Sequence, residues 1–109
     1  MVVFTDEAAV ERLSLPAHER TALLHAIEKL EVFGPLLGYP HSSAVRGHGF
    51  AGLRELRPRA GRSPWRGLYQ RVGNVFVIAA ISPEAQVNHR RFEKAARLAL
   101  LRLADIGDD

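Results

Sequence analysis

The sequence predicts an α+β fold, a small and mainly antiparallel β-sheet with an N-terminal helical pair and a C-terminal helix. Apolar residues recur at helical spacing near both ends of the chain, and short apolar runs bounded by Gly, Pro and Asn fill the middle. The chain has 109 residues, of which 47% are hydrophobic and 25% charged. This length and composition suit one core, so a single domain over residues 1–109 is expected.

The N-terminal part predicts a strand followed by two helices. Residues 2–4, VVF, form the expected strand, and Thr5 is expected to cap the first helix. Ala9, Val10 and Leu13 are expected on the buried face of that helix. The second helix shows apolar residues at positions 0, +3, +4 and +7, namely Leu23, Ala26, Ile27 and Leu30. Gly34-Pro35 follows and is expected to end it.

The middle of the chain predicts three strands. Residues 34–52 are expected to be mainly loop, residues 53–57 a strand, and residues 58–64 a second loop. Residues 65–72 and 75–81 form a hairpin whose second strand is apolar throughout, as expected of a central strand. The final helix has an apolar face of Phe92, Ala96, Ala99 and Leu103. The helices are expected on one side of the sheet and the basic region on the other.

The net charge of +3 is unevenly distributed along the chain. Residues 46–71 hold seven arginines and one acid, whereas residues 1–45 hold three bases and six acids. Arginine outnumbers lysine 13 to 2, which coding bias explains, but bias does not explain the lack of acids around the arginines. Charge segregated in this way attracts polyanions, so a surface for nucleic acid or an acidic partner is predicted.

Several function classes lack their sequence signatures. The chain has no cysteine, no glycine-rich phosphate loop, no G-x-S-x-G motif and no HExxH motif, and its five histidines show no metal-ligand spacing. We therefore expect no cofactor and no metal. The longest strongly apolar run, residues 75–81, is too short to span a bilayer, so a cytoplasmic chain with no membrane partner is expected.

The remaining side chains suit cleavage of an RNA phosphodiester. Attack by the 2′-hydroxyl needs a base, cations for the phosphorane charge, and an acid for the leaving oxygen. Arg57, Arg66 and His89 are the predicted catalytic residues, the two arginines lying side by side across a loop and His89 moving protons. The predicted RNA-binding residues are Arg54, Arg59, Arg62, Trp65, Tyr69, Arg90 and Arg91. Trp65 and Tyr69 share a strand face, where each either stacks on a base or packs into the core.

Three segments in order resemble the RelE/HigB group of bacterial type II toxins, within the RelE/ParE superfamily. They are GLRELR at residues 52–57, WRGLYQRVGNVFVIAAI at residues 65–81, and FEKAARLALLRL at residues 92–103. The resemblance implies a toxin that cleaves messenger RNA, commonly in the ribosomal A site. It also implies a cognate antitoxin, which in the HigB branch is usually a helix-turn-helix DNA-binding protein. By the same resemblance Arg57 and Arg66 bind phosphate, and His89 falls near a residue that assists proton transfer.

The segment SPEAQ, residues 82–86, departs from the family pattern. Ser82 and Pro83 stand where the family usually has one or two basic residues, so Arg90 and Arg91 are the expected substitutes. Two alternatives therefore stay open. One is a ParE-like toxin that inhibits DNA gyrase and cuts no RNA, and the other is a basic binding module without catalysis.

Overall fold

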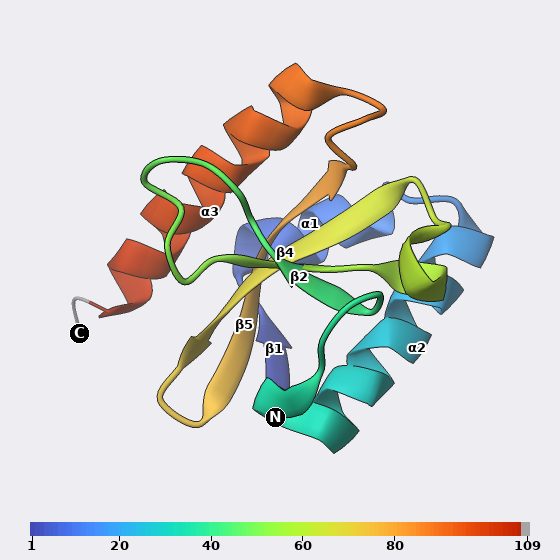
Figure 1. Ribbon diagram of the computed structural model, residues 1–109, viewed down its shortest axis with the longest axis horizontal. Helices are drawn as coiled ribbons and strands as arrows, with labels where there is room; N and C mark the ends of the chain where they lie inside the picture. Colours follow the sequence, from blue (N-terminus) through green and yellow to red (C-terminus); the bar gives the residue numbers. More distant parts are fainter. Residues whose placement is uncertain (108–109) are drawn as a thin grey trace.

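A computed structural model describes residues 1–107 of the chain, and it has the expected α+β fold with an N-terminal helical pair (Figure 1). The strands form one sheet in the order β1-β5-β4-β3-β2. In chain order the elements are β1 (Val2–Phe4), α1 (Asp6–Leu13), α2 (Ala17–Phe33), η1 (Gly34–Leu36), β2 (Ser42–Ala44), β3 (Arg54–Leu56), η2 (Pro58–Gly61), β4 (Trp65–Val72), β5 (Val75–Pro83) and α3 (His89–Gly107).

The β4–β5 hairpin forms the middle of the sheet, as the sequence predicts. Gly73 has a φ of +61° in its turn, a conformation that glycine adopts at no steric cost. All strand pairs are antiparallel except β1 with β5, which run parallel with Val3 opposite Val77. β2 lies within the segment expected to be mainly loop. It is short and polar, and its pairing with β3, such as Ser43 with Glu55, is what makes it a strand.

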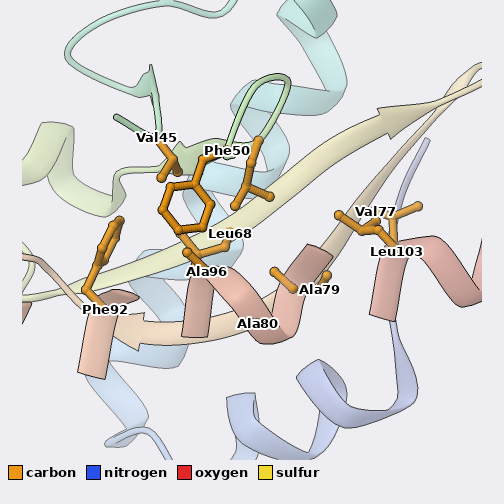
Figure 2. Packing of buried hydrophobic residues seen from close by; sticks show 11 residues of the cluster. Val45, Phe50, Leu68, Val77, Ala79, Ala80, Phe92, Ala96 and Leu103 are labelled. Carbon is orange, nitrogen blue, oxygen red and sulfur yellow. The ribbon is translucent and has the colours of Figure 1, made fainter. Parts of the chain in front are cut away.

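Helices cover both faces of the sheet, so the expectation that they share one side is wrong. One core joins α3 to the sheet through the predicted apolar face of Phe92, Ala96, Ala99 and Leu103 (Figure 2). The other core joins α1 and α2 to the opposite face through residues such as Leu23 and Ile78. Because β4 and β5 carry apolar side chains on both faces, burying them requires a helical layer on each side.

The buried face of α1 also differs from the expectation. The Oγ1 of Thr5 accepts the Ala8 N–H at 3.1 Å, which confirms the predicted cap. Ala8 is buried, whereas Val10 and Leu13 are 66% and 61% exposed. Glu11 lies three residues after Ala8, and its carboxylate accepts the Ile81 N–H at 3.1 Å. The side of α1 that faces β5 therefore carries Ala8 and Glu11 and not the largest apolar residues of the helix.

No helix within residues 1–107 has both the length and the apolar character needed to cross a membrane.

The two-sided packing predicts unequal effects of shortening two leucines of α3. Leu103 is 7% exposed in the core, whereas Leu101 is 66% exposed. Leu103→Ala is expected to lower the free energy of unfolding by about 2–5 kcal/mol because it leaves a cavity. Leu101→Ala is expected to change it by less than about 0.5 kcal/mol. Urea unfolding of both variants measures the difference, and equal losses would contradict the placement of α3.

Candidate functional site

Arg57 and Arg66 lie together, joined by the carboxylate of Glu55. Arg57 follows β3 and Arg66 lies near the start of β4, and these strands are neighbours with Leu56 opposite Gly67. The Oε1 atom of Glu55 accepts from Nη1 of Arg57 at 2.9 Å and from Nε of Arg66 at 3.3 Å. The structure thus places the two arginines side by side, with a carboxylate between them.

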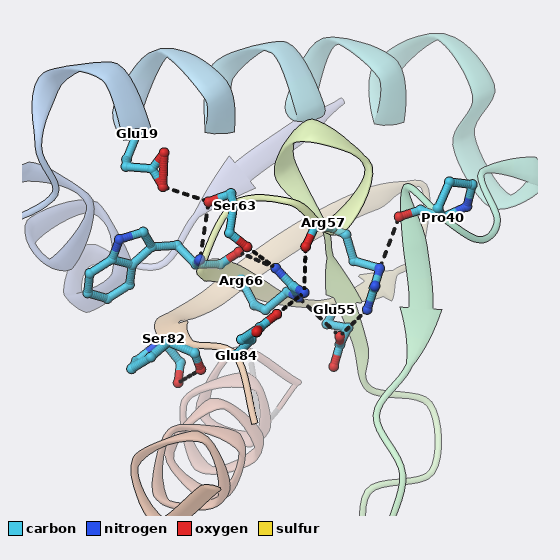
Figure 3. Close-up of polar contacts among 11 residues, drawn as sticks. Glu19, Pro40, Glu55, Arg57, Ser63, Arg66, Ser82 and Glu84 are labelled. Carbon is cyan, nitrogen blue, oxygen red and sulfur yellow. Dashed lines mark hydrogen bonds and ion pairs between the residues drawn. The ribbon is translucent and has the colours of Figure 1, made fainter. Parts of the chain in front are cut away.

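Arg66 uses all of its hydrogen-bond donors within the protein. Its side chain is 2% exposed, and it makes five hydrogen bonds, as many as a guanidinium has N–H groups (Figure 3). Nη2 donates to Oε2 of Glu84 at 2.5 Å. The backbone acceptors are the carbonyl oxygens of Gly61, Ser63 and Trp65. The predicted phosphate contact of Arg66 stays a prediction, and in this structure no N–H of its guanidinium is free for it.

The segment of residues 82–86 stabilises Arg66 instead of adding positive charge. Ser82 and Pro83 are buried at the end of β5, and the Oγ of Ser82 donates to the Pro83 carbonyl oxygen at 2.8 Å. Glu84 follows and pairs with Arg66. The residue just beyond Ser82 and Pro83 is therefore an acid that neutralises a buried arginine.

Tyr69 and Trp65 contribute to packing. Tyr69 is buried in the core below α2, and its ring meets Phe76 edge to face with centroids 6.1 Å apart. The Tyr69 hydroxyl and Oγ of Ser42 are 2.5 Å apart, and Nε of Arg54 donates to the same Oγ at 3.0 Å. Trp65 is half-buried against the same core. The buried position of Tyr69 favours its role as a core residue over base stacking.

His89, Arg90 and Arg91 lie exposed at the start of α3. The His89 side chain is 78% exposed, and its Nε2 lies 3.4 Å from Oε2 of Glu93. Among the contacts of residues 1–107, none joins His89 to Arg57 or Arg66. The structure does not bring the three predicted catalytic residues into direct contact.

A hollow of about 450 Å³ lies between α2 and the segments around η2, and we call it the α2–η2 hollow. Its lining residues are His18, Thr21, Ala22, His25, Ala26, Lys29, His41, Arg57 and Arg59. This lining combines three imidazoles, two guanidinium groups and one ammonium group, and it contains no carboxylate. Such a surface suits a phosphate group, since cations and imidazoles both donate hydrogen bonds to its oxygens.

Arg57 is held at the edge of this hollow. Its Nε donates to the Pro40 carbonyl oxygen at 3.0 Å, and its guanidinium lies 5.1 Å from the centre of the Tyr39 ring. The backbone N–H of Arg57 also donates to the His41 carbonyl oxygen at 2.8 Å. A guanidinium fixed by several contacts loses little conformational entropy when it binds an anion.

Arg59 is held by Glu19 of α2. Nη1 of Arg59 donates to Oε1 of Glu19 at 2.5 Å, and the Ser63 hydroxyl donates to Oε2 at 2.7 Å. Burial raises the pKa of Glu19, but the hydrogen bonds from Ser63 and Arg59 outweigh it and hold the pKa below its ordinary value of 4.5. Arg59 and Ala60 both have positive φ, 55° and 56°. Strained residues of this kind cluster at functional sites, so η2 is a candidate segment.

The sequence reasoning missed the residues of α2. His18, His25 and Lys29 are spaced by seven and four residues, which places them along one helix face, although this spacing matches no metal-ligand pattern. His41 is distant from these residues in the sequence and lines the same hollow only once the chain is folded. Within residues 1–107, no three His, Asp or Glu side chains are grouped to hold a metal ion.

The bonding of Arg66 predicts a structural effect of its removal. Arg66→Ala leaves Glu55 and Glu84 without their buried partner and is expected to lower the free energy of unfolding by about 3–5 kcal/mol. Arg62→Ala, which removes an exposed side chain, is expected to cost less than about 0.5 kcal/mol. Urea unfolding compares the two. A loss below about 1 kcal/mol for Arg66→Ala would show that these bonds do not hold the site.

Comparison with known proteins agrees with this architecture. The family described as "Phage derived protein Gp49-like (DUF891)" matches residues 11–80. No curated protein matches the sequence.

Solved structures with the same fold include those of RelE proteins. A chain of the intact E. coli RelBE toxin–antitoxin complex is 17% identical, with a TM-score of 0.58 over 77% of this chain and 95% of that one. A chain of the RelE–RelB complex from Pyrococcus horikoshii OT3 is 22% identical, with a TM-score of 0.55 over 75% and 91%. The isolated E. coli RelE toxin is 16% identical, with a TM-score of 0.57 over 86% and 96%. The resemblance to the RelE/HigB group is thereby confirmed, and the chain belongs to the Gp49-like family with a RelE fold.

Proposed function

We propose that this chain is the toxin of a type II toxin–antitoxin system and cleaves messenger RNA during translation without a metal ion. The observation that carries the proposal is the α2–η2 hollow, whose lining holds three cations and three imidazoles but no acid. On a RelE fold, this hollow offers the groups that cleavage by the 2′-hydroxyl requires.

The charge distribution around the hollow supports binding of an RNA backbone. Arg57 and Arg59 each pair with a carboxylate, Glu55 and Glu19. Neither acid lines the hollow, whereas both arginines do. The fixed cations therefore face the position of an anion, and fixed donors stabilise the charge that develops on a reacting phosphate.

The proposed partners are a cognate antitoxin, messenger RNA and the ribosome. Related structures are toxin–antitoxin complexes, which supports an antitoxin partner, and we propose a helix-turn-helix DNA-binding protein for that role. The exposed Arg62, Arg90 and Arg91 are the side chains available to supplement the hollow in RNA binding.

A second candidate function is inhibition of DNA gyrase in the manner of ParE toxins. The observation that favours it is the complete bonding of Arg66, one partner of which is Glu84. If the phosphate had to contact Arg66, this arrangement would oppose RNA cleavage.

Induction of the chain in a bacterial host, followed by primer extension on abundant transcripts, distinguishes the two. Wild type is expected to give discrete cuts within translated regions. Arg57→Gln is expected to reduce cutting about 100- to 1000-fold, because it removes a preorganised cation. Arg71→Gln, which changes an exposed arginine at the far end of β4, is the matched control and is expected to cut like wild type. Growth arrest with intact transcripts would contradict the nuclease proposal and favour gyrase inhibition.

A further inference from the structure

Three of the five histidines line the α2–η2 hollow, and they come from two segments that are separate in the sequence. His18 and His25 belong to α2, whereas His41 lies in the segment just before β2. The His41 carbonyl oxygen accepts a hydrogen bond from the backbone N–H of Arg57 at 2.8 Å, which joins the segment before β2 to the end of β3. The cations of the lining come from three places, with Lys29 on α2, Arg57 just after β3 and Arg59 in η2.

We propose that His25 and His41 are the pair that transfers protons when RNA is cleaved in this hollow. The proposal rests on the proposed nuclease function and assigns its acid–base residues. Displacement at phosphorus places the attacking and leaving oxygens roughly in line, so the base and the acid must approach from opposite sides. His25 and His41 suit this requirement because they line the same hollow from two different segments, α2 and the segment just before β2.

His18 is less suited to proton transfer than the other two. Its Nε2 lies 3.9 Å from Oε1 of Glu19, and its carbonyl oxygen accepts from Nη2 of Arg59 at 3.2 Å. It therefore belongs to the Glu19–Arg59 contact that fixes η2 against α2. His25 is exposed and His41 half-buried, so both can exchange protons with water between turnovers.

The reaction balances without any further reagent. One imidazole takes the proton of the 2′-hydroxyl as the 2′ oxygen bonds to phosphorus. The bond from phosphorus to the 5′ oxygen breaks, and the other imidazolium protonates that oxygen. The products are a 2′,3′-cyclic phosphate and a 5′-hydroxyl, and the two imidazoles have exchanged protonation states. Lys29, Arg57 and Arg59 stabilise the phosphorane charge.

The charged groups around the pair set the form of the pH dependence. Lys29 and His18 share the wall of His25, while Arg57 and Arg59 face it from the end of β3 and from η2. Glu19 and Glu55 pair with the arginines but do not line the hollow. A reaction that needs one group as base and another as acid gives a bell-shaped rate profile. Removing either imidazole is expected to abolish one limb of that profile.

The test measures cleavage of an mRNA in a cell-free translation reaction, at several pH values, with purified chains. His25→Gln and His41→Gln are each expected to reduce the rate at least 100-fold and to lose one limb of the pH profile. His48→Gln changes an exposed loop histidine outside the hollow and is the control, expected to cut like wild type. Circular dichroism and urea unfolding check that each variant is folded.

A second measurement separates this inference from the proposed function. The imidazole NMR signals of the full chain are followed during titration with a 2′-O-methyl RNA oligonucleotide, which cannot be cleaved in this way. The signals of His25 and His41 are expected to shift, and that of His48 to stay in place. If wild type cuts RNA and both variants cut it as well as wild type, the proton-transfer role of His25 and His41 is rejected while the nuclease function stands. The same conclusion follows if His89→Ala alone abolishes cutting. If wild type cuts no RNA, the proposed function fails, and the proton-transfer role fails with it.

Discussion

The buried guanidinium of Arg66 connects the segments that surround the candidate site. It bonds to Glu55 of β3, to the carbonyl of Gly61 in η2, to the turn before β4, and to Glu84 after β5. A buried charge is tolerated only when it is paired and fully hydrogen-bonded. The positions of these four segments are therefore linked, and Glu55 is fixed where it can also hold Arg57. The same charge that an RNA-cleaving site would present to phosphate is used here to organise the loops around it.

At the α2–η2 hollow, the carboxylates are kept apart from the surface that the positively charged side chains line. Glu19 and Glu55 each hold an arginine, yet only the arginines line the hollow. Lys29 and three imidazoles complete a lining with no negative charge. Fixed donors of this kind act on a reacting phosphate without reorganising first, which is the main way in which a protein stabilises developing charge. The arginines in the middle of the chain thus fall into two groups. Arg66 holds loops together in the interior, whereas Arg57 and Arg59 line the hollow.

Local signals in the sequence predicted local features of the fold. The β4–β5 hairpin, the Thr5 cap and the buried face of α3 all follow from residues close together in the chain. Features that depend on distant partners were missed. The strand β2 exists only because β3 pairs with it, and helices cover both faces because β4 and β5 are apolar on both. The bonding of Arg66 depends on Glu84, 18 residues away, and His41 and His25 come to line the same hollow only after folding.

The structure of the chain bound to a 2′-O-methyl RNA oligonucleotide tests the central claim most directly. The account predicts a backbone phosphate in the α2–η2 hollow, contacting Lys29, Arg57 and Arg59 with His25 and His41 on either side. It also predicts that Arg66 keeps its bonds to Glu55 and Glu84. A phosphate bound to Arg66 after displacement of Glu84, with the hollow empty, would contradict the account and place the chemistry at the start of β4.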